Sequence, residues 1–411
     1  MRKTNKQSGI TLVALVITII ILLILAGIAI SSLTQTGLFS KAQEAKQKTE
    51  EKAEEENTTL NEYEKWIAKY ENNEHGGQPI TDVKTSETNP EGAMPKGATV
   101  IEGNGDEGIV IKDSNDNEWV WVEVPKTIFT TAKNNTDYTN IKKDLVSYSE
   151  KYREGAQEQK RYWDDEWYSG CGIETKEKYE EMYNKMLSSV YTNGGFWIAR
   201  YEAGIEGTNT DSKKDEIDSV RYIHSNITND SPKAVSQADR IPYNYVFCNE
   251  AQTLASAMST DSSKTSSLLF GIQWDLTCKF IETKINPTTA DIIKTDSTSW
   301  GNYNNSSITL TRGKYNKTPN TQSKWLNVTS VKNTEMLLTT GASDDVKKMN
   351  IYDFAGNLWE WTLEKSGIEG SPYTMRGGSY CNEGSDRTAS FRCQRRPTET
   401  FESQGFRSTL Y

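Results

Sequence analysis

The chain has 411 residues, which gives room for one large domain or two ordinary ones with appendages. Its net charge of -10 excludes nucleic acid as an expected partner, because phosphate binding needs clustered Lys and Arg. Two histidines and five cysteines without a CxxC pair exclude a histidine-based metal centre and a disulfide-stapled fold. The one disulfide that the sequence leaves open would join Cys381 and Cys393.

An uncharged run of 21 residues, Ile10 to Ile30, stands near the N-terminus. A helix of this length spans about 30 Å, the thickness of a bilayer's hydrocarbon core. Arg2, Lys3 and Lys6 precede the run and no basic residue follows before Lys41, so the N-terminus is expected in the cytoplasm. We expect a single-pass cell-membrane protein with a transmembrane helix over residues 10–30 and its C-terminal part outside the cell.

The basic segment 1–9 ends in Gly9, directly before the apolar run. It resembles the leader of type IV prepilins, which implies cleavage after Gly9 and a mature chain that begins at Ile10. Pilins usually carry Glu at the fifth mature position, where this chain has Ala14. Two interpretations stay open: a plain membrane anchor, and a filament subunit that self-assembles through its N-terminal helix.

Composition divides the rest of the chain into three parts. Residues 31–73 are rich in Ala, Glu, Lys and Gln and carry Glu44 and Lys48 at helical i,i+4 spacing, which predicts a helical stalk. The polar residues 74–97 predict a linker, and residues 98–411 form the predicted ectodomain.

The ectodomain begins with two strand-like runs, residues 109–112 and 118–124, on either side of five Asp, Asn and Ser residues (113–117). These five lack the Gly and the terminal acid of a calcium loop, so a hairpin turn is favoured. Residues 133–172 have weak periodicity and predict irregular structure.

Helical spacing recurs further along the chain. Apolar residues from Tyr179 to Val190 fall at i, i+3, i+4 and i+7, which predicts an amphipathic core helix. A strand is expected over residues 195–202, and two more helices over 249–258 and 273–281.

A turn and strand near the C-terminus organise the remaining sequence. Gly356 and Asn357 form a pair that takes positive φ at low cost. From Leu358 to Leu363 the residues alternate between two faces, and Trp359 and Trp361 share one of them. The pattern predicts a strand with two large aromatic side chains packed on one face.

Six motifs occur in order between Gly194 and Arg407. They are Gly194-Gly195-Phe196-Trp197-Ile198-Ala199-Arg200-Tyr201-Glu202, Gln273-Trp274-Asp275, Ser299-Trp300-Gly301-Asn302, Asp353-Phe354-Ala355-Gly356-Asn357-Leu358-Trp359-Glu360-Trp361, Arg376-Gly377-Gly378-Ser379-Tyr380 and Gly405-Phe406-Arg407. Together they resemble the formylglycine-generating-enzyme (sulfatase-modifying factor) family. The resemblance implies an α+β domain of C-type-lectin type with sparse regular secondary structure, here preceded by the transmembrane and stalk helix.

The resemblance also implies a calcium site at the Asp353 turn. Asp353 and Glu360 would supply carboxylates, and Gly356 and Leu358 would supply carbonyl oxygens, the ligands that calcium prefers. The alternative is that Glu360 forms a salt bridge with Arg376 or Arg407.

Enzymes of this family bind Cu(I) through two thiolates five residues apart, just after the R-G-G-S-[WY] segment. Cys381 stands near the first position, but residues 384–387 around the second contain no cysteine, and Cys393 is twelve residues on. We therefore expect neither copper nor oxidase activity.

The segment between Tyr380 and Gln404 is the predicted ligand-binding loop. Its candidate residues are Tyr380, Asn382, Glu383, Ser385, Asp386, Arg387, Arg392, Gln394, Arg395 and Arg396. The arginines favour an anionic ligand or an extracellular protein, and the alternative is a solvated strand and loop. The segment also lies where the related variable receptors of diversity-generating retroelements are diversified.

The sequence thus predicts a membrane-anchored cell-surface protein whose catalytically inactive head binds a ligand. The first alternative is a pilin-like subunit that displays this head on a filament. A copper-dependent formylglycine-generating oxidase is the second.

Overall fold

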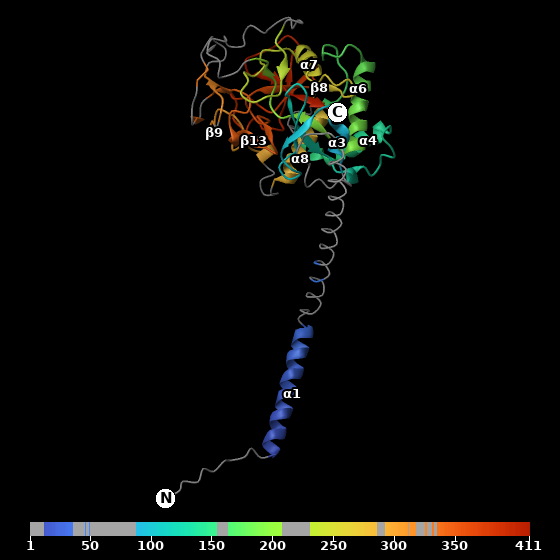
Figure 1. Ribbon diagram of the computed structural model, residues 1–411, viewed down its shortest axis with the longest axis vertical. Helices are drawn as coiled ribbons and strands as arrows, with labels where there is room; N and C mark the ends of the chain where they lie inside the picture. The colour runs from blue at the N-terminus through green and yellow to red at the C-terminus, as the bar shows by residue number, and fades with distance from the viewer. Residues whose placement is uncertain are drawn as a thin grey trace. The chain divides into compact units, whose positions relative to one another are not determined.

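The computed structural model describes residues 12–35, 46, 49, 88–153, 163–207, 231–285, 292–310, 312–317, 325–326, 331–332 and 335–411. The chain divides into two compact units, residues 1–74 and 75–411 (Figure 1). The predicted cleavage position at Gly9 and Ile10 and most of the predicted stalk lie outside the described residues.

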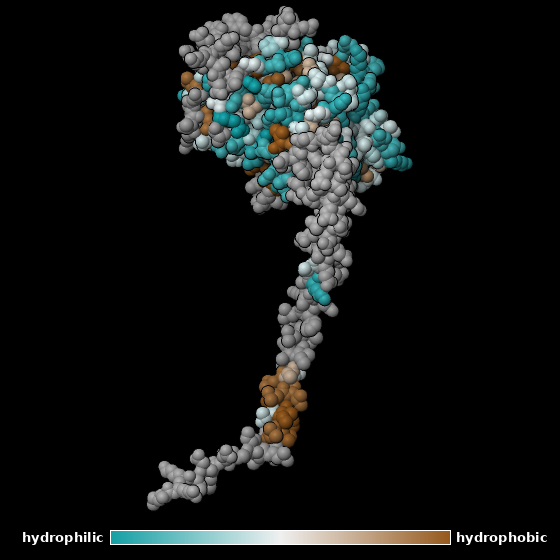
Figure 2. Space-filling view, in the orientation of Figure 1, coloured by the Kyte–Doolittle hydropathy of each residue, from teal (hydrophilic) through white to brown (hydrophobic). Residues whose placement is uncertain are grey.

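The first unit contains helix α1, Leu12–Gln35. Its large apolar side chains between Leu15 and Leu25 are 47% to 67% exposed, and they form the brown band in Figure 2. In the part of the chain that the structure describes, no helix combines the length and the hydropathy needed to cross a membrane. The transmembrane helix over residues 10–30 stays a prediction.

The second unit contains a six-stranded antiparallel sheet. Its strands, in spatial order, are β1 (Thr99–Glu102), β2 (Val110–Lys112), β3 (Glu118–Glu123), β5 (Gly195–Ala199), β19 (Ser408–Leu410) and β8 (Ser266–Leu268). The predicted hairpin is confirmed, because β2 and β3 pair directly and Asp116 in their turn has a φ of 60°. Trp121 of β3 contacts Trp197 of β5, with ring centroids 5.0 Å apart.

A second sheet lies at the C-terminal end of the chain. Its strands, in order, are β17 (Arg392–Arg395), β16 (Tyr373–Arg376), β15 (Trp359–Ser366) and β18 (Gln404–Phe406), and β4 (Trp163–Asp164) also pairs with β15. Strand β15 confirms the prediction for residues 358–363. Strand β18 runs parallel to it, and Arg407 then leads directly into β19 of the first sheet. The C-terminal residues therefore join the two sheets.

Helices cover these sheets. They are α3 (Pro90–Ala93), α4 (Tyr138–Tyr148), α5 (Glu150–Arg153), α6 (Lys176–Asn193), α7 (Cys248–Ser256) and α8 (Gly271–Lys284), with a 3-10 turn η1 (Lys126–Ile128). The last three α-helices confirm the predicted ones. Helix α6 begins at the Thr175 cap and ends at Gly194, which has a left-handed φ of 73°.

Helix α4 corrects the prediction of irregular structure for residues 133–172. It packs against α6 (Figure 1) and buries Ile141 and Leu145 together with Asp144. The Asp144 carboxylate accepts hydrogen bonds from the Thr131 hydroxyl at 2.7 Å and the Ala132 amide at 3.0 Å. A buried acid on the inner face interrupts the apolar pattern, which is why periodicity missed this helix.

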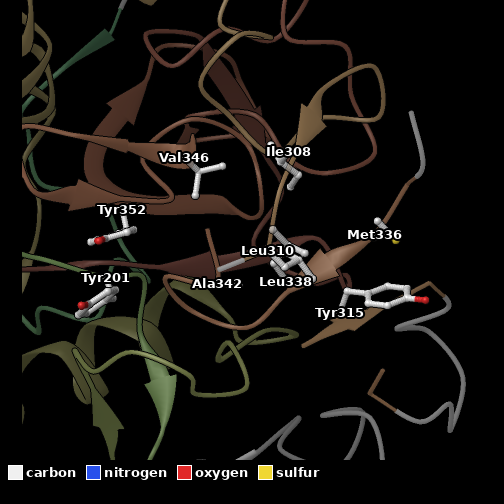
Figure 3. Packing of buried hydrophobic residues seen from close by; sticks show 9 residues of the cluster. All are labelled: Tyr201, Ile308, Leu310, Tyr315, Met336, Leu338, Ala342, Val346 and Tyr352. Carbon is white, nitrogen blue, oxygen red and sulfur yellow. The ribbon is translucent and has the colours of Figure 1, made fainter. Parts of the chain in front are cut away.

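Short two-stranded ribbons connect the larger elements. They are β6 (Gly204–Ile205) with β7 (Ala234–Val235), β9 (Ser307–Ile308) with β11 (Val331–Lys332), β10 (Tyr315–Asn316) with β12 (Leu337–Leu338), and β13 (Lys347–Lys348) with β14 (Ile351–Tyr352), which follows the 3-10 turn η4 (Asp344–Val346). Apolar residues of this region, including Ile308, Leu338 and Tyr352, form one buried cluster (Figure 3). The mixture of helices and mostly antiparallel strands agrees with the predicted α+β class.

Candidate functional site

The turn before β15 has the conformation that its sequence favours. Gly356 and Asn357 have φ values of 74° and 56°, so both adopt the predicted left-handed region. A Cβ atom on Gly356 would lie 2.2 Å from the carbonyl oxygen of Asn302. Only glycine therefore fits here, and the Asn357 amide donates to the same Asn302 oxygen at 2.9 Å.

The side chain of Asn357 links this turn to three other segments. Its Nδ2 donates to Glu202 Oε2 at 2.7 Å, and its Oδ1 accepts from Asn302 Nδ2 at 2.8 Å and from the Leu338 amide at 3.0 Å. The second oxygen of Glu202 accepts from the Leu358 amide at 2.9 Å. These polar groups are therefore used for internal bonding.

Three buried carboxylates, Glu202, Asp353 and Glu360, lie within the electrostatic influence of Arg407, which forms its ion pair with Glu360. We name these four residues the Arg407 cluster. Arg407 donates to Glu360 Oε1 at 2.8 Å and to Oε2 at 3.1 Å. Asp353 Oδ2 accepts from the Gly341 amide at 2.7 Å, whereas Oδ1 is buried without a hydrogen-bond partner. Burial raises the pKa of Asp353 to about 6 and also raises the pKa of Glu202 and Glu360.

The calcium ligands inferred from the resemblance lie in this cluster. Both oxygens of Glu360 accept from Arg407, which is the alternative that the sequence left open. Asp353 Oδ1 is the one carboxylate oxygen here that a cation fits without displacing a partner. Among the residues that the structure describes, no group of three or more His, Cys, Asp or Glu side chains is arranged to hold a metal ion. Calcium at Asp353, Gly356, Leu358 and Glu360 stays a prediction.

The predicted ligand-binding loop begins after β16 and packs on an asparagine-rich turn. The Asn304 amide donates to the Asn382 carbonyl at 2.9 Å, and the Gly384 amide donates to Asn305 Oδ1 at 3.2 Å. Asn382 Oδ1 accepts from the Ser379 amide at 3.1 Å. The loop is irregular, but these bonds fix its backbone on a rigid base.

The ten predicted binding residues differ in exposure. Glu383, Ser385, Asp386 and Arg396 are exposed, Asn382, Arg387, Gln394 and Arg395 are half-buried, and Tyr380 and Arg392 are buried. Tyr380 packs against Leu337 and Leu358. Contrary to the prediction, the side chains of Tyr380 and Arg392 are buried, Tyr380 in this apolar cluster and Arg392 among acidic side chains.

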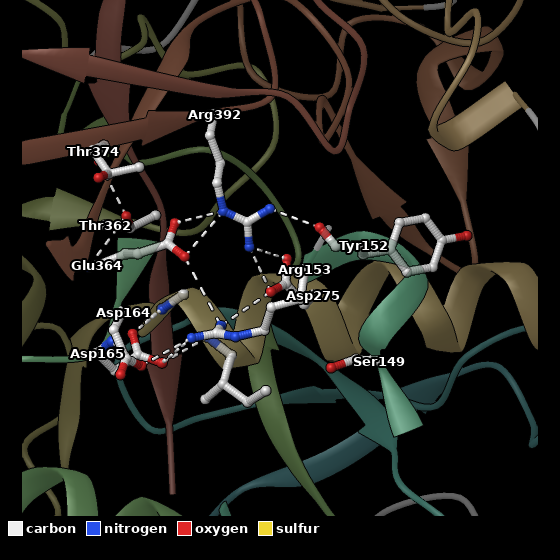
Figure 4. A network of polar contacts seen from close by, with 12 residues as sticks. Ser149, Tyr152, Arg153, Asp164, Asp165, Asp275, Thr362, Glu364, Thr374 and Arg392 are labelled. Atoms are coloured by element: carbon white, nitrogen blue, oxygen red, sulfur yellow. Dashed lines mark hydrogen bonds and ion pairs between the residues drawn. The ribbon is translucent and has the colours of Figure 1, made fainter. Parts of the chain in front are cut away.

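Arg392 lies at the centre of a buried ion-pair network (Figure 4). Its Nη2 donates to both oxygens of Asp275, at 2.7 Å and 2.6 Å, and its Nε donates to both oxygens of Glu364, at 3.0 Å and 3.1 Å. Arg376 contacts Asp275 at 2.8 Å, and Arg153 contacts it at 3.1 Å. We name Arg153, Asp165, Asp275, Glu364, Arg376 and Arg392 the Arg392 network.

This network keeps its central acid ionised. Burial alone would raise the pKa of Asp275, but Arg392, Arg376 and Arg153 hold that pKa below its usual value. The sequence motifs contained Asp275 without a function and gave Arg376 only as an alternative partner of Glu360, whereas Arg376 pairs with Asp275 and Glu364. Arg153 comes from the segment predicted to be irregular, so its role had no sequence signal.

None of the five cysteines, all of which the structure describes, forms a disulfide, so the pairing of Cys381 with Cys393 that the sequence left open does not occur. Cys381 is half-buried beside Tyr380 and Trp325, and burial raises the pKa of its thiol to about 11. Cys393 lies on β17 in register with Met375 of β16.

The fold and this loop define a class: an α+β domain whose buried ion pairs support irregular, polar surface loops. Residues 175–410 match the model of the "Sulfatase-modifying factor enzyme 1-like domain" family, and the chain belongs to this family. The family resemblance inferred from the six motifs is thereby confirmed.

Two solved structures are similar to this chain. "Crystal Structure of CarF" has a TM-score of 0.32 at 14% identity, over 52% of this chain and 85% of that one. "Treponema denticola variable protein 1" has a TM-score of 0.27 at 12% identity, over 53% and 84%. A comparison with curated proteins gives no match.

Proposed function

We propose that the chain is a cell-surface protein whose head binds a ligand and carries out no oxidation, held at the membrane by its apolar N-terminal segment. The observation that carries the proposal is that Cys381 has no second cysteine at the spacing that binds copper. Five residues after Cys381 the chain has Asp386 in place of a second cysteine. Burial raises the pKa of the Cys381 thiol to about 11, so it stays protonated at neutral pH and is a poor Cu(I) ligand.

The geometry of the loop supports binding. Its backbone is braced by the asparagine-rich turn, while Glu383, Ser385, Asp386 and Arg396 extend into solvent. Polar side chains on a rigid, irregular loop are the usual means by which a fixed scaffold recognises a ligand. With Arg392 buried, Arg387, Arg395 and Arg396 carry the predicted preference for an anionic partner.

Oxidase activity is tested with the purified full-length chain, Cu(I) and a cysteine-containing peptide. We expect no aldehyde product from the wild type. The variant Asp386→Cys restores the spacing of two thiols, and we expect it to bind Cu(I) at least about tenfold more tightly. Conversion of the peptide cysteine to an aldehyde by the wild type would overturn the proposal.

Ligand binding by the loop is tested with heparin as an anionic probe and poly-lysine as a cationic one. We expect heparin to bind and Arg396→Gln to weaken it severalfold, whereas Lys185→Gln on α6 leaves it unchanged. Tighter binding of poly-lysine than of heparin would contradict an anionic partner. Equal effects of Arg396→Gln and Lys185→Gln on heparin binding would contradict a site at this loop.

The anchor rests on the uncharged residues 10–30 and the exposed apolar side chains of α1. We expect the chain to stay in the membrane pellet after carbonate extraction. The leader that ends at Gly9 favours the filament subunit as a second candidate. A mature N-terminus at Ile10 together with sedimentable filaments would support that candidate, and an intact N-terminus would exclude it.

A further inference from the structure

Three cations surround one tyrosine ring away from the predicted ligand-binding loop. Measured to the ring centroid of Tyr352, the guanidinium carbon of Arg312 lies at 5.0 Å, that of Arg200 at 5.4 Å and the Lys347 ammonium at 5.5 Å. Tyr201 stacks on the same ring at 5.1 Å. Figure 3 shows the two tyrosines one above the other, with both hydroxyls on the side away from the aliphatic members of the cluster.

Three carboxylates lie beside these cations, and they contact the two arginines. Glu118 and Glu102 accept from the two terminal nitrogens of Arg200, at 2.8 Å and 2.6 Å. Asp344 accepts from the Tyr352 hydroxyl at 2.7 Å and lies 3.5 Å from Arg312. No carboxylate of the described residues lies within ion-pair distance of Lys347.

Two donors at this place are buried and unused. The Nε groups of Arg200 and Arg312 have no hydrogen-bond partner, and Arg200 is only 5% exposed. A buried N–H without an acceptor costs about 1–3 kcal/mol, so an absent acceptor is the natural explanation for such a pair. The site remains accessible, because the Arg312 side chain is 32% exposed and Lys347 is half-buried.

We propose that Arg200, Arg312 and Lys347 form a binding site for a sulfate or phosphate group. Guanidinium N–H donors match the oxygens of such anions, and the Nε groups of Arg200 and Arg312 have no other acceptor. Lys347 adds a cation that no carboxylate of the described residues pairs with. The protein carries a net charge of -10, so this cation-rich spot is not a general property of its surface.

Inorganic sulfate and phosphate are titrated into the full-length chain at constant ionic strength, with chloride as the reference anion. We expect saturable binding and a rise in melting temperature with both anions but not with chloride. Arg312→Gln and Lys347→Gln should each weaken binding about tenfold or more. The control Lys185→Gln removes the same charge on an exposed face of α6 and should change the affinity less than about twofold.

Two further comparisons keep the proposal open to refutation. Arg396→Gln on the ligand-binding loop should leave sulfate binding intact, which separates this site from the one under Proposed function. Heparin fragments and a phosphopeptide, each competed with sulfate, distinguish a sulfated from a phosphorylated source. The proposal is wrong if binding is absent, or if Arg312→Gln and Lys347→Gln bind sulfate as tightly as the wild type while melting at its temperature.

Discussion

The head contains two groups of buried charges that differ in their balance. The Arg392 network has three arginines for three buried acids, whereas the Arg407 cluster has one arginine for three. In the first, Asp275 has a lowered pKa. In the second, all three acids have raised pKa values. Within the Arg392 network burial also raises the pKa of Asp165, to about 6. The pKa is lowered at Asp275, where three guanidinium groups outweigh burial.

The balance matches what each group connects. The Arg392 network joins Arg153 and Asp165, which precede the residues matched by the family, to acids and arginines within them. At that junction the three arginines keep Asp275 ionised, while burial raises the pKa of Asp165 to about 6. The Arg407 cluster lies under the turn of β15, where incomplete pairing leaves room for a proton or a cation.

Removing a central arginine gives the largest expected effect. Arg392→Gln leaves Asp275 and Glu364 buried with too little positive charge, and we expect a loss of about 3–5 kcal/mol in unfolding free energy at pH 7. Chemical denaturation measures this loss. The exposed Arg396→Gln is the control and should change stability by less than about 0.5 kcal/mol.

Lowering the pH sharpens the contrast. Arg407→Gln should regain more of its lost stability near pH 5 than Arg392→Gln does. The acids of the Arg407 cluster then lack their arginine and accept protons, whereas Asp275 keeps Arg376 and Arg153. Equal recovery of the two variants would show that charge balance does not distinguish the two groups.

Gly356→Ala tests whether backbone fit, rather than charge, shapes the Arg407 cluster. The added Cβ would overlap the Asn302 carbonyl at a φ of 74°, and we expect a loss of about 3 kcal/mol. Gly370 has a φ of 75° with nothing within 4 Å, so Gly370→Ala carries the conformational cost alone, about 1 kcal/mol. Thermal denaturation of both variants separates steric overlap from backbone strain. Equal losses of stability in the two variants would show that the overlap with Asn302 costs nothing.

The pH dependence of stability reports the unbalanced cluster directly. The pKa of Asp353 is raised from 3.8 to about 6, so the native state binds its proton more tightly than the unfolded state does. This stabilisation is complete below about pH 4 and is lost as the pH rises through about 6, which amounts to about 3 kcal/mol.

Asp353→Asn should remove this contribution, while Asp386→Asn, at an exposed position, should keep the wild-type profile. Urea denaturation between pH 4 and pH 7 measures the difference. A wild-type stability that increases across this range would mean that other groups outweigh Asp353.

Residue type and short-range spacing predicted the turns, strands and helices that depend on neighbouring residues in the chain. The Gly356 turn, strand β15 and helix α6 followed from residue type and spacing, and ordered motifs gave the family. Helix α4 did not follow, because Asp144 stands on its buried face. Arg392 was assigned to the surface for a related reason: a charged residue in a polar segment looks solvated, and its acids lie 28 and 117 residues away in the chain. Long-range ion pairs leave no short-range signal.

The smallest effect expected is that of calcium on the Arg407 cluster. A calcium ion would contact the unpartnered Asp353 Oδ1 but would have to compete with Arg407 for Glu360, so we expect weak binding. At a calcium concentration ten times the dissociation constant, the gain in stability is about 1.4 kcal/mol. A thermal shift that magnesium does not reproduce and that disappears in both Glu360→Gln and Asp353→Asn would establish the site. Without a shift at about 10 mM calcium, above the weakest affinities of extracellular calcium modules, the single cation of the cluster is Arg407 and its surplus acids are neutralised by protons.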